Sequence, residues 1–221
     1  MIAKELISDN IPFLKTTDTI EDALNIMETL KVAHLPIVNK LSLLGLISDT
    51  TLYDKQLTKS TIGELKQEYA MFFVKTDQNI LDVISIMSQN NISVVPVLDE
   101  YDKYIGSIDS TSILKSFAAI SSLDKPGAVI VLEINKYDYT LSKIAQIIES
   151  NDAKVLNMFV DSTKDSSMLE VCIKLNTNDL RSILRTFERY EYNVKSWISD
   201  DDSANKLYME RFNLLMKYLN T

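Results

Sequence analysis

The sequence predicts an α+β protein with two tandem β-α-β-β-α units, a further domain of order β-α-β-β-α-β, and a C-terminal helix. Three observations predict it: a repeat in the first half, alternating strand and helix patterns in the second, and the composition. Of the 221 residues 46% are hydrophobic and 24% charged, so the chain can bury a core and is not a disordered protein. The predicted boundaries are 1–58, 59–122, 123–200 and 201–221.

The repeat is found by sliding the chain against itself by sixty positions. Identical residues then cluster in one stretch of each copy rather than scattering along the chain. Conservative apolar pairs fill the intervals between them. The identical pairs are Lys15/Lys75, Thr16/Thr76, Ile20/Ile80, Asp22/Asp82, Ile26/Ile86, Met27/Met87 and Pro36/Pro96.

Each copy has the same order of elements. A short apolar segment precedes a helix, for which Asp18 and Glu21 have capping-box spacing in the first copy. Two short strands and a polar turn then predict a β-hairpin, and a second helix over 50–57 or 111–120 ends the unit. The apolar sheet face left open by one unit can be covered by the other. The first helices carry apolar stripes of period 3.6, namely Ile20, Ala23, Leu24 and Met27, and Ile80, Val83, Ile84 and Met87.

The second half begins at the turn signal Lys125-Pro126-Gly127. Strands are predicted over 128–134, 153–161, 167–175 and 193–197, and helices over 140–149 and 179–190. Residues 201–221 are predicted to form an amphipathic helix. We expect this helix to pack on its own chain and not on a membrane, because its polar face is not notably basic.

Charge and composition exclude several classes of protein. The net charge of −8 and the pI near 4.8 argue against a nucleic-acid binder. The longest apolar run, within 128–134, is far shorter than the roughly 20 residues that span a bilayer, so we expect a soluble protein with no membrane partner. The single cysteine, Cys172, and the absence of a signal-peptide pattern at the N-terminus favour the cytoplasm.

Four motifs carry a resemblance to a known family: the apolar-Pro-apolar strands around Pro36 and Pro96, and the strands that begin at Gly45 and Gly106 and run into the last helix of each copy. Together they resemble a CBS-domain pair over roughly residues 1–120. The resemblance implies a non-catalytic regulatory protein that binds an adenine nucleotide or a related ligand (AMP, ADP, ATP or S-adenosylmethionine) between the paired units. It also implies a homodimer, and a regulated protein that the sequence does not name.

The second half resembles an ACT domain, a small ferredoxin-like regulatory fold, through its element order and its Pro-Gly start. The whole layout is similar to the acetoin-utilisation regulatory proteins. In amino-acid-binding ACT domains the loop after the first strand often carries a glycine, but here that loop, 135–139, has none. Ligand binding and subunit pairing through the edge of the sheet therefore both stay open for this half.

In nucleotide-binding CBS units the Gly-led strand usually ends in Ser or Thr, and an Asp follows three residues later. The hydroxyl can donate to a phosphate, and the carboxylate can accept from the ribose hydroxyls. The first copy has Ser48 and then Thr51, whereas the second has Asp109 and then Ser112. An ionised Asp109 would repel a phosphate, so we interpret Asp109, like Ser48, as a helix N-cap. An uncharged or cationic ligand, a metal-bridged phosphate, or no ligand remain open for the second copy.

The other candidate ligand-binding residues follow from the same resemblance. Pro12, Phe13, Phe72 and Phe73 hold positions where the family pins a base, but we expect at least one phenylalanine in each of the segments Pro12-Phe13 and Phe72-Phe73 to pack in the core. His34 can stack on a base or have a purely structural role. The neighbours Ala33, Pro36, Ser93 and Pro96 complete the set.

Two rival functions remain. The first is a ligand-free structural or protein-interaction module, its clefts filled by Phe13 and Phe73. The second, an enzyme, is least supported, because the one histidine and the one cysteine lie in different halves and no metal-binding motif occurs. We expect no metal site.

Overall fold

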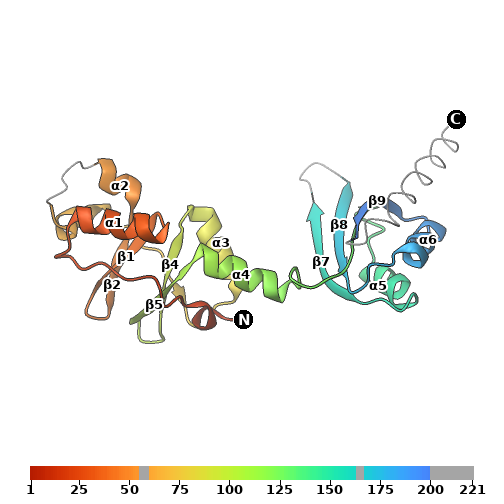
Figure 1. Cartoon of the computed structure of the whole chain (residues 1–221), viewed down its shortest axis with the longest axis horizontal. Helices are drawn as coiled ribbons and strands as arrows, with labels where there is room; N and C mark the ends of the chain where they lie inside the picture. The colour runs from red at the N-terminus through yellow and green to blue at the C-terminus, as the bar shows by residue number, and fades with distance from the viewer. Residues whose placement is uncertain (55–59, 163–166, 200–221) are drawn as a thin grey trace. The chain divides into compact units, whose positions relative to one another are not determined.

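The computed structural model describes residues 1–54, 60–162 and 167–199 (Figure 1). It consists of two compact units, Met1–Phe117 and Ala118–Thr221. This division falls a few residues before the predicted boundary at 122/123, and the four predicted domain limits stay predictions. The predicted C-terminal helix over 201–221 lies outside the described residues.

The first unit contains the two predicted repeats. The first copy has the elements η1 (Ala3–Leu6), α1 (Ile20–Leu30), β1 (His34–Asn39), β2 (Ser42–Ser48) and α2 (Asp49–Asp54). The second copy repeats them as η2 (Ile62–Glu68), α3 (Ile80–Asn90), β4 (Val94–Leu98), β5 (Tyr104–Asp109) and α4 (Ser110–Ile120), and has in addition the short strand β3 (Val74–Lys75). β1 pairs with β2, and β4 with β5, in antiparallel hairpins, as predicted.

The predicted capping box at the start of α1 is wrong by one residue. The N-cap is Thr19, whose hydroxyl accepts a 3.1 Å hydrogen bond from the N–H of Asp22. The Asp18 carboxylate instead accepts from the N–H of Lys15 at 2.8 Å and closes the turn before the helix. Because the Asp18 carboxylate is hydrogen-bonded within the turn, the next side chain that can accept a hydrogen bond, Thr19, caps the helix.

Each copy packs its N-terminal segment, which contains η1 or η2, against the other copy, so the two copies exchange these segments. Ala3 of the first copy donates its N–H to the carbonyl of Gln78 in the second, at 2.8 Å. Ile62, at the start of the second copy, donates in the same way to the carbonyl of Asp18 in the first, also at 2.8 Å. Ala3 is accordingly buried in the core of the second copy, and Ile62 in the core of the first. Neither copy completes its core from its own residues.

Each exchanged segment crosses a glycine of the other copy. At Gly45 a Cβ would lie 2.8 Å from the Cβ of Tyr69 and 3.0 Å from the carbonyl oxygen of Ala70, and at Gly106 it would lie 2.5 Å from Cγ2 of Ile7. Both glycines have positive φ, +149° and +157°. The Gly-led strands therefore need glycine for the close approach of the exchanged segment.

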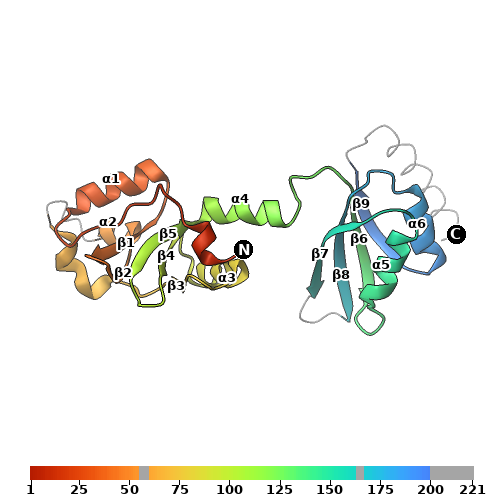
Figure 2. The same cartoon turned by 90° about the horizontal axis from the view of Figure 1, so that it is seen from below.

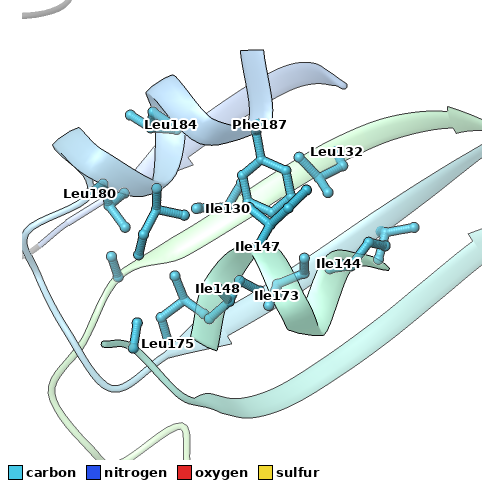
Figure 3. Close-up of a cluster of buried hydrophobic side chains, with 14 of the residues drawn as sticks. Ile130, Leu132, Ile144, Ile147, Ile148, Ile173, Leu175, Leu180, Leu184 and Phe187 are labelled. Atoms are coloured by element: carbon cyan, nitrogen blue, oxygen red, sulfur yellow. The ribbon is translucent and has the colours of Figure 1, made fainter. Parts of the chain in front are cut away.

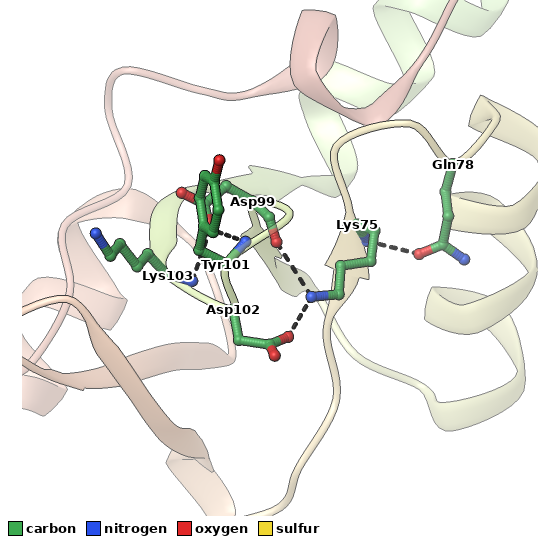
Figure 4. Close-up of polar contacts among 6 residues, drawn as sticks. All are labelled: Lys75, Gln78, Asp99, Tyr101, Asp102 and Lys103. Carbon is green, nitrogen blue, oxygen red and sulfur yellow. Dashed lines mark hydrogen bonds and ion pairs between the residues drawn. The ribbon is translucent and has the colours of Figure 1, made fainter.

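The turn between β4 and β5 is tied to β3 by Lys75 (Figure 4). Its ammonium group donates to the carbonyl of Asp99 at 3.1 Å and forms an ion pair with Asp102. The Asp99 carboxylate accepts from the N–H groups of Tyr101 and Lys103, which holds the turn in shape. These contacts fix the β4-β5 hairpin against β3, the first strand of the second copy.

The second unit has the predicted β-α-β-β-α-β order. Its elements are β6 (Val129–Asn135), α5 (Leu141–Glu149), β7 (Val155–Ser162), β8 (Met168–Leu175), α6 (Arg181–Arg189) and β9 (Asn193–Ile198). The strands form one antiparallel sheet in the order β7-β8-β6-β9, and α5 and α6 cover the same face (Figure 2). Phe187 of α6 and Ile147 of α5 lie in the core that seals this face (Figure 3).

We expect Gly45→Ala to lower the free energy of unfolding by roughly 1–3 kcal/mol, because the new methyl group meets backbone and Cβ atoms at a strained φ. Chemical denaturation followed by circular dichroism measures the change. Ser42→Ala, at the exposed start of the same strand, serves as the control and should have little effect. Equal stability of Gly45→Ala and wild type would contradict the close crossing described above.

Candidate ligand-binding site

The first copy gathers three hydroxyl groups where β2 meets α2. The Ser48 hydroxyl accepts from the N–H of Thr51 at 3.1 Å and lies 2.8 Å from the hydroxyls of both Thr50 and Thr51. Ser48 is the N-cap of α2, as interpreted from the sequence. Ser48 and Thr51 are partly exposed, so their hydroxyl groups can reach a ligand as well as the helix.

The second copy has a carboxylate at the corresponding place. Asp109 accepts from the N–H groups of Thr111 and Ser112, at 2.9 and 3.0 Å, and from the Ser112 hydroxyl at 2.7 Å. Its side chain is only 7% exposed. This is the N-cap geometry predicted for Asp109, and it engages both carboxylate oxygens.

The electrostatics of Asp109 favour its ionised form. Burial acts to raise the pKa of this carboxyl group, but hydrogen bonds from Ser112, Ser8 and Thr111 outweigh burial and lower the pKa. A negative charge therefore sits at this point of the second copy at neutral pH. Ser8 was not among the predicted site residues. It belongs to the exchanged segment, where its N–H donates to the carbonyl of Ser107 at 2.9 Å.

Ala33, His34 and Ser93 meet where the two copies join. The Ser93 hydroxyl accepts from the N–H of Ala33 at 2.9 Å and lies 3.3 Å from Nδ1 of His34, and the Ser93 N–H also donates to this nitrogen at 3.3 Å. His34 is paired in register with Ser48 across the first hairpin. The structure thus brings Ser48, Thr51, Ala33, His34 and Ser93 into one region.

Nδ1 of His34 must carry a lone pair to accept from the Ser93 N–H, and this hydrogen bond fits a neutral ring with its proton on Nε2. Burial lowers the pKa of His34, while the charge of Asp49 acts in the opposite direction. The Asp49 N–H donates to the carbonyl of Ala33 at 2.9 Å, which holds the start of α2 against the start of β1. Asp49 is a second residue of this region that the sequence analysis did not identify.

Two of the three aromatic candidates, Phe13 and Phe73, are partly exposed and are not buried in the clefts. Phe13 is 40% exposed and makes an edge-on contact with Tyr104 of the second copy, with ring centroids 5.8 Å apart. Phe73 is 38% exposed, and Phe72 packs against the core of the second copy. The prediction that at least one phenylalanine of each segment packs in the core thus holds for Phe72 and is wrong for Phe13.

Three prolines complete the candidate set. Pro36 and Pro96 are buried in β1 and β4, where they belong to the core. Pro12 is exposed and lines a cavity of about 460 Å³ between the first exchanged segment and α1, together with Ile11, Asn25 and other residues. It is a shallow groove open to solvent, and Ser48, Thr51, His34 and Ser93 are not among the residues that line it.

The second unit has a larger cavity of about 740 Å³ between α5 and the turn that follows α6. Charged groups of both signs line it: Lys143 and Arg189 are the cations, and Asp138 and Glu191 are among the acids. Burial and the charge of Asp138 raise the pKa of Tyr192 in its wall. This groove was not predicted, because its residues come from four separate stretches of the chain.

Residues 1–54, 60–162 and 167–199 hold no group of three or more His, Cys, Asp or Glu side chains that could bind a metal ion. Across the same described ranges, every helix is too short or too polar to span a membrane. His34 and Cys172 belong to different units.

We expect Asp109→Ala to lower the free energy of unfolding by about 1–2 kcal/mol, because two N–H groups at the start of α4 lose their acceptor. Asp109→Ser should lower the free energy of unfolding by a smaller amount, since serine is also an N-cap residue. Urea denaturation of both variants measures the difference. Asp77→Ala, at an exposed acid of the same copy, is the control. Equal losses for the alanine and serine variants would argue against the cap.

We expect the stability contributed by neutral His34 to be present above pH 6.5, the ordinary pKa, and to be lost as the pH falls, because the unfolded chain then binds a proton that the folded chain does not. Unfolding measured at about pH 8 and about pH 5 should show a smaller pH effect for His34→Gln than for wild type. An identical pH effect in both proteins would show that the ring is not held neutral.

Comparison with known proteins identifies the first unit. The family model of the CBS domain matches the chain twice, over residues 3–57 and 65–119. Inosine-5′-monophosphate dehydrogenase of Methanocaldococcus jannaschii is 27% identical over 133 residues, which cover 58% of this chain and 26% of that protein. The chain spans less than half the length of the curated relatives it matches.

Solved structures of CBS pairs are similar as well. A CBS domain pair/ACT domain protein from Thermotoga maritima is 17% identical with a TM-score of 0.47, covering 54% of this chain and 98% of that chain. A CBS domain pair in complex with 5′-methylthioadenosine and S-adenosyl-L-methionine is 28% identical with a TM-score of 0.44, covering 53% and 99%. The two matches to the family model correspond to the two repeats that exchange their leading segments. Residues 3–119 thus form a tandem pair of CBS domains, and through them the chain belongs to the CBS-domain family.

Proposed function

We propose that this chain is a non-catalytic regulatory protein whose CBS pair senses an adenine nucleotide or a related small molecule. The observation that carries the proposal is the tandem CBS pair itself, in which each Gly-led strand ends in a polar side chain at the start of a helix. The second unit serves in assembly or in transmitting the signal. The regulated protein partner and the cytoplasmic location remain predictions.

The first copy is the proposed phosphate site. Ser48 and Thr51 offer hydroxyl donors in a partly exposed cluster. No carboxylate follows Ser48 by three residues, so the usual acceptor for the ribose hydroxyls is missing and Thr51 stands in its place. This supports a ligand held mainly through its phosphate at this end.

The second copy is proposed to reject phosphate. The ionised carboxylate of Asp109 places a negative charge at the start of α4, and two like charges about 4 Å apart cost about 1 kcal/mol in water and about 4 kcal/mol at a partly buried site. An uncharged or cationic adenosine derivative avoids this repulsion. The two copies therefore prefer different ligands.

The rival proposal is a ligand-free interaction module with clefts filled by its own side chains. Phe13 and Phe73, the side chains invoked for that role, are both more than one third exposed. The exposure of both side chains favours ligand sensing, and the ligand-free interaction module is the alternative function.

The ACT-like assignment of the second unit belongs to this proposal. Its support is the β-α-β-β-α-β order and the single layer of two helices. The loop 135–139 without glycine favours subunit pairing over amino-acid binding. We therefore propose that this unit joins two copies of the chain in a homodimer.

The nucleotide proposal predicts binding in isothermal titration of the full chain with AMP, ADP, ATP and S-adenosylmethionine. We expect at least one of them to bind with a dissociation constant below about 1 mM. The phosphate ligands should bind more weakly to Ser48→Ala, and Ser42→Ala should leave their affinity unchanged. If all four ligands fail at millimolar concentration, the nucleotide proposal is wrong and the interaction module takes its place.

A second titration tests the role of Asp109. Asp109→Ser removes the charge and keeps an N-cap, so we expect tighter binding of phosphate ligands to the second copy, by roughly tenfold. Adding Ser48→Ala to this variant separates the two sites, because only the second site then offers a serine cap. Weaker nucleotide binding after Asp109→Ser would show that the carboxylate contacts the ligand.

A further inference from the structure

The sheet of the second unit has two faces, and α5 and α6 both cover the same one (Figure 2). On that face Ile130 and Leu132 of β6 are buried. Side chains alternate between the two faces of a strand, so Val129 and Val131 lie on the other face, where they are partly exposed. We call this second surface the open face. Its side chains indicate what kind of element packs on it.

The open face carries a cluster of apolar side chains. Register pairing places Cys172 of β8 beside Val131, and Ile198 of β9 beside Val129. Ile198 is 70% exposed. A sheet face that meets only water normally presents polar side chains. The apolar cluster of Val129, Val131, Cys172 and Ile198 therefore indicates that another element covers this face.

A row of acids crosses the open face beside the apolar cluster. Glu133 of β6 pairs in register with Glu170 of β8, and Glu170 pairs with Asp161 of β7. Like charges in directly opposite positions destabilise a sheet. Lys195 forms an ion pair with Glu170, and the Lys174 ammonium group donates to a backbone carbonyl further along β8. The row keeps an excess of negative charge, which favours an element that brings a cation.

The chain that follows β9 can supply this cation. The described part ends at Ser199, directly after Ile198, and residues 200–221 lie outside it. Residues 203–221 contain three cations and one acid. The helix predicted there has an apolar stripe with Arg211 at its centre. The other members of the stripe are Leu207, Leu214, Leu215 and Tyr218. An arginine within an apolar stripe calls for a carboxylate on the surface against which the stripe packs.

The dimensions of the segment match those of the open face. Along β6, Val131 lies about 7 Å and Glu133 about 13 Å from Val129. In a helix that begins at residue 203, Leu207 lies about 6 Å and Arg211 about 12 Å from the start. The three residues 200–202 can span about 10 Å, which is enough to carry the chain into a second layer. A helix that starts beside β9 and runs along β6 thus brings Arg211 to the row of acids.

We infer that residues 203–221 pack as a helix on the open face of their own chain, with Leu207 on the apolar cluster and Arg211 at Glu133. The second unit then has three layers, with the sheet between helices. A second copy of the open face is a poorer occupant, because it brings the same excess of acids. The inference depends neither on nucleotide binding nor on the homodimer proposed above.

The thiol of Cys172 reports on this contact, because it is the only cysteine of the chain and lies in the apolar cluster. Its rate of labelling with a maleimide is measured on the folded full chain. Leu207→Glu should raise this rate by roughly tenfold, because a carboxylate on the apolar cluster displaces the helix. Asn205→Glu, on the opposite side of the predicted helix, should leave the rate unchanged. Equal rates for wild type and Leu207→Glu would overturn the inference.

A charge swap tests the contact of Arg211. Arg211→Glu should also raise the labelling rate of Cys172, and adding Glu133→Arg should bring the rate back toward that of wild type, because the ion pair is restored with reversed charges. A general loss of stability would not be reversed in this way. A double variant as reactive as Arg211→Glu alone would overturn the contact between Arg211 and Glu133.

A disulfide keeps the test decisive if Leu207→Glu does not fold, and it also shows which chain supplies the helix. In the oxidised full chain, Leu207→Cys should form an intrachain disulfide with Cys172, and Asn205→Cys should form none. Peptide mass spectrometry and a non-reducing gel detect the bond. A disulfide between two chains would assign the helix to a second copy, and the absence of any disulfide from Leu207→Cys would leave the open face uncovered. Either result would overturn the inference and leave the nucleotide proposal standing.

Discussion

The structure of the first unit depends on the exchange of leading segments between its two CBS copies. Each copy presents an apolar surface that its own residues do not cover, and the segment preceding the other copy supplies the missing side chains, Ala3 and Leu6 on one side and Ile62 and Leu65 on the other. The crossings at Gly45 and Gly106 fix where these segments run. Because each core contains residues of both copies, one copy is not expected to be stable without the other.

The exchange also determines the composition of the candidate sites. Asp109 lies in the second copy, yet one of its hydrogen-bond partners, Ser8, comes from the segment that crosses over from the first. The contact between the two copies is also asymmetric. His34 of the first copy accepts a hydrogen bond from the N–H of Ser93 in the second copy. The residue of the second copy that corresponds to His34 is Val94, which has no such acceptor. Two copies of one fold thus present two different chemical environments.

Much of this could be predicted from the sequence, because it rests on local patterns. The apolar stripes, the hairpins and the six elements of the second unit follow from periodicity within short windows, and the capping role of Asp109 follows from residue preference. Thr19 was missed as the N-cap of α1, since Asp18 and Thr19 are both good caps and the turn before the helix decides between them. Ser8 and Asp49 were missed because their roles depend on contacts between distant segments, which no local pattern encodes.

The geometry indicates how a ligand in the first copy can affect the second. Ser48 is paired in register with His34, and His34 is hydrogen-bonded to Ser93 at the start of β4. From there, β4 pairs with β5, where Val94 is the register partner of Asp109. Strand pairing and the hydrogen bonds between His34 and Ser93 thus connect the Ser48 cluster with Asp109. Burial lowers the pKa of His34, so its ring keeps the Nδ1 acceptor of the Ser93 N–H at neutral pH, and only acidification below the ordinary pKa of histidine would remove that acceptor.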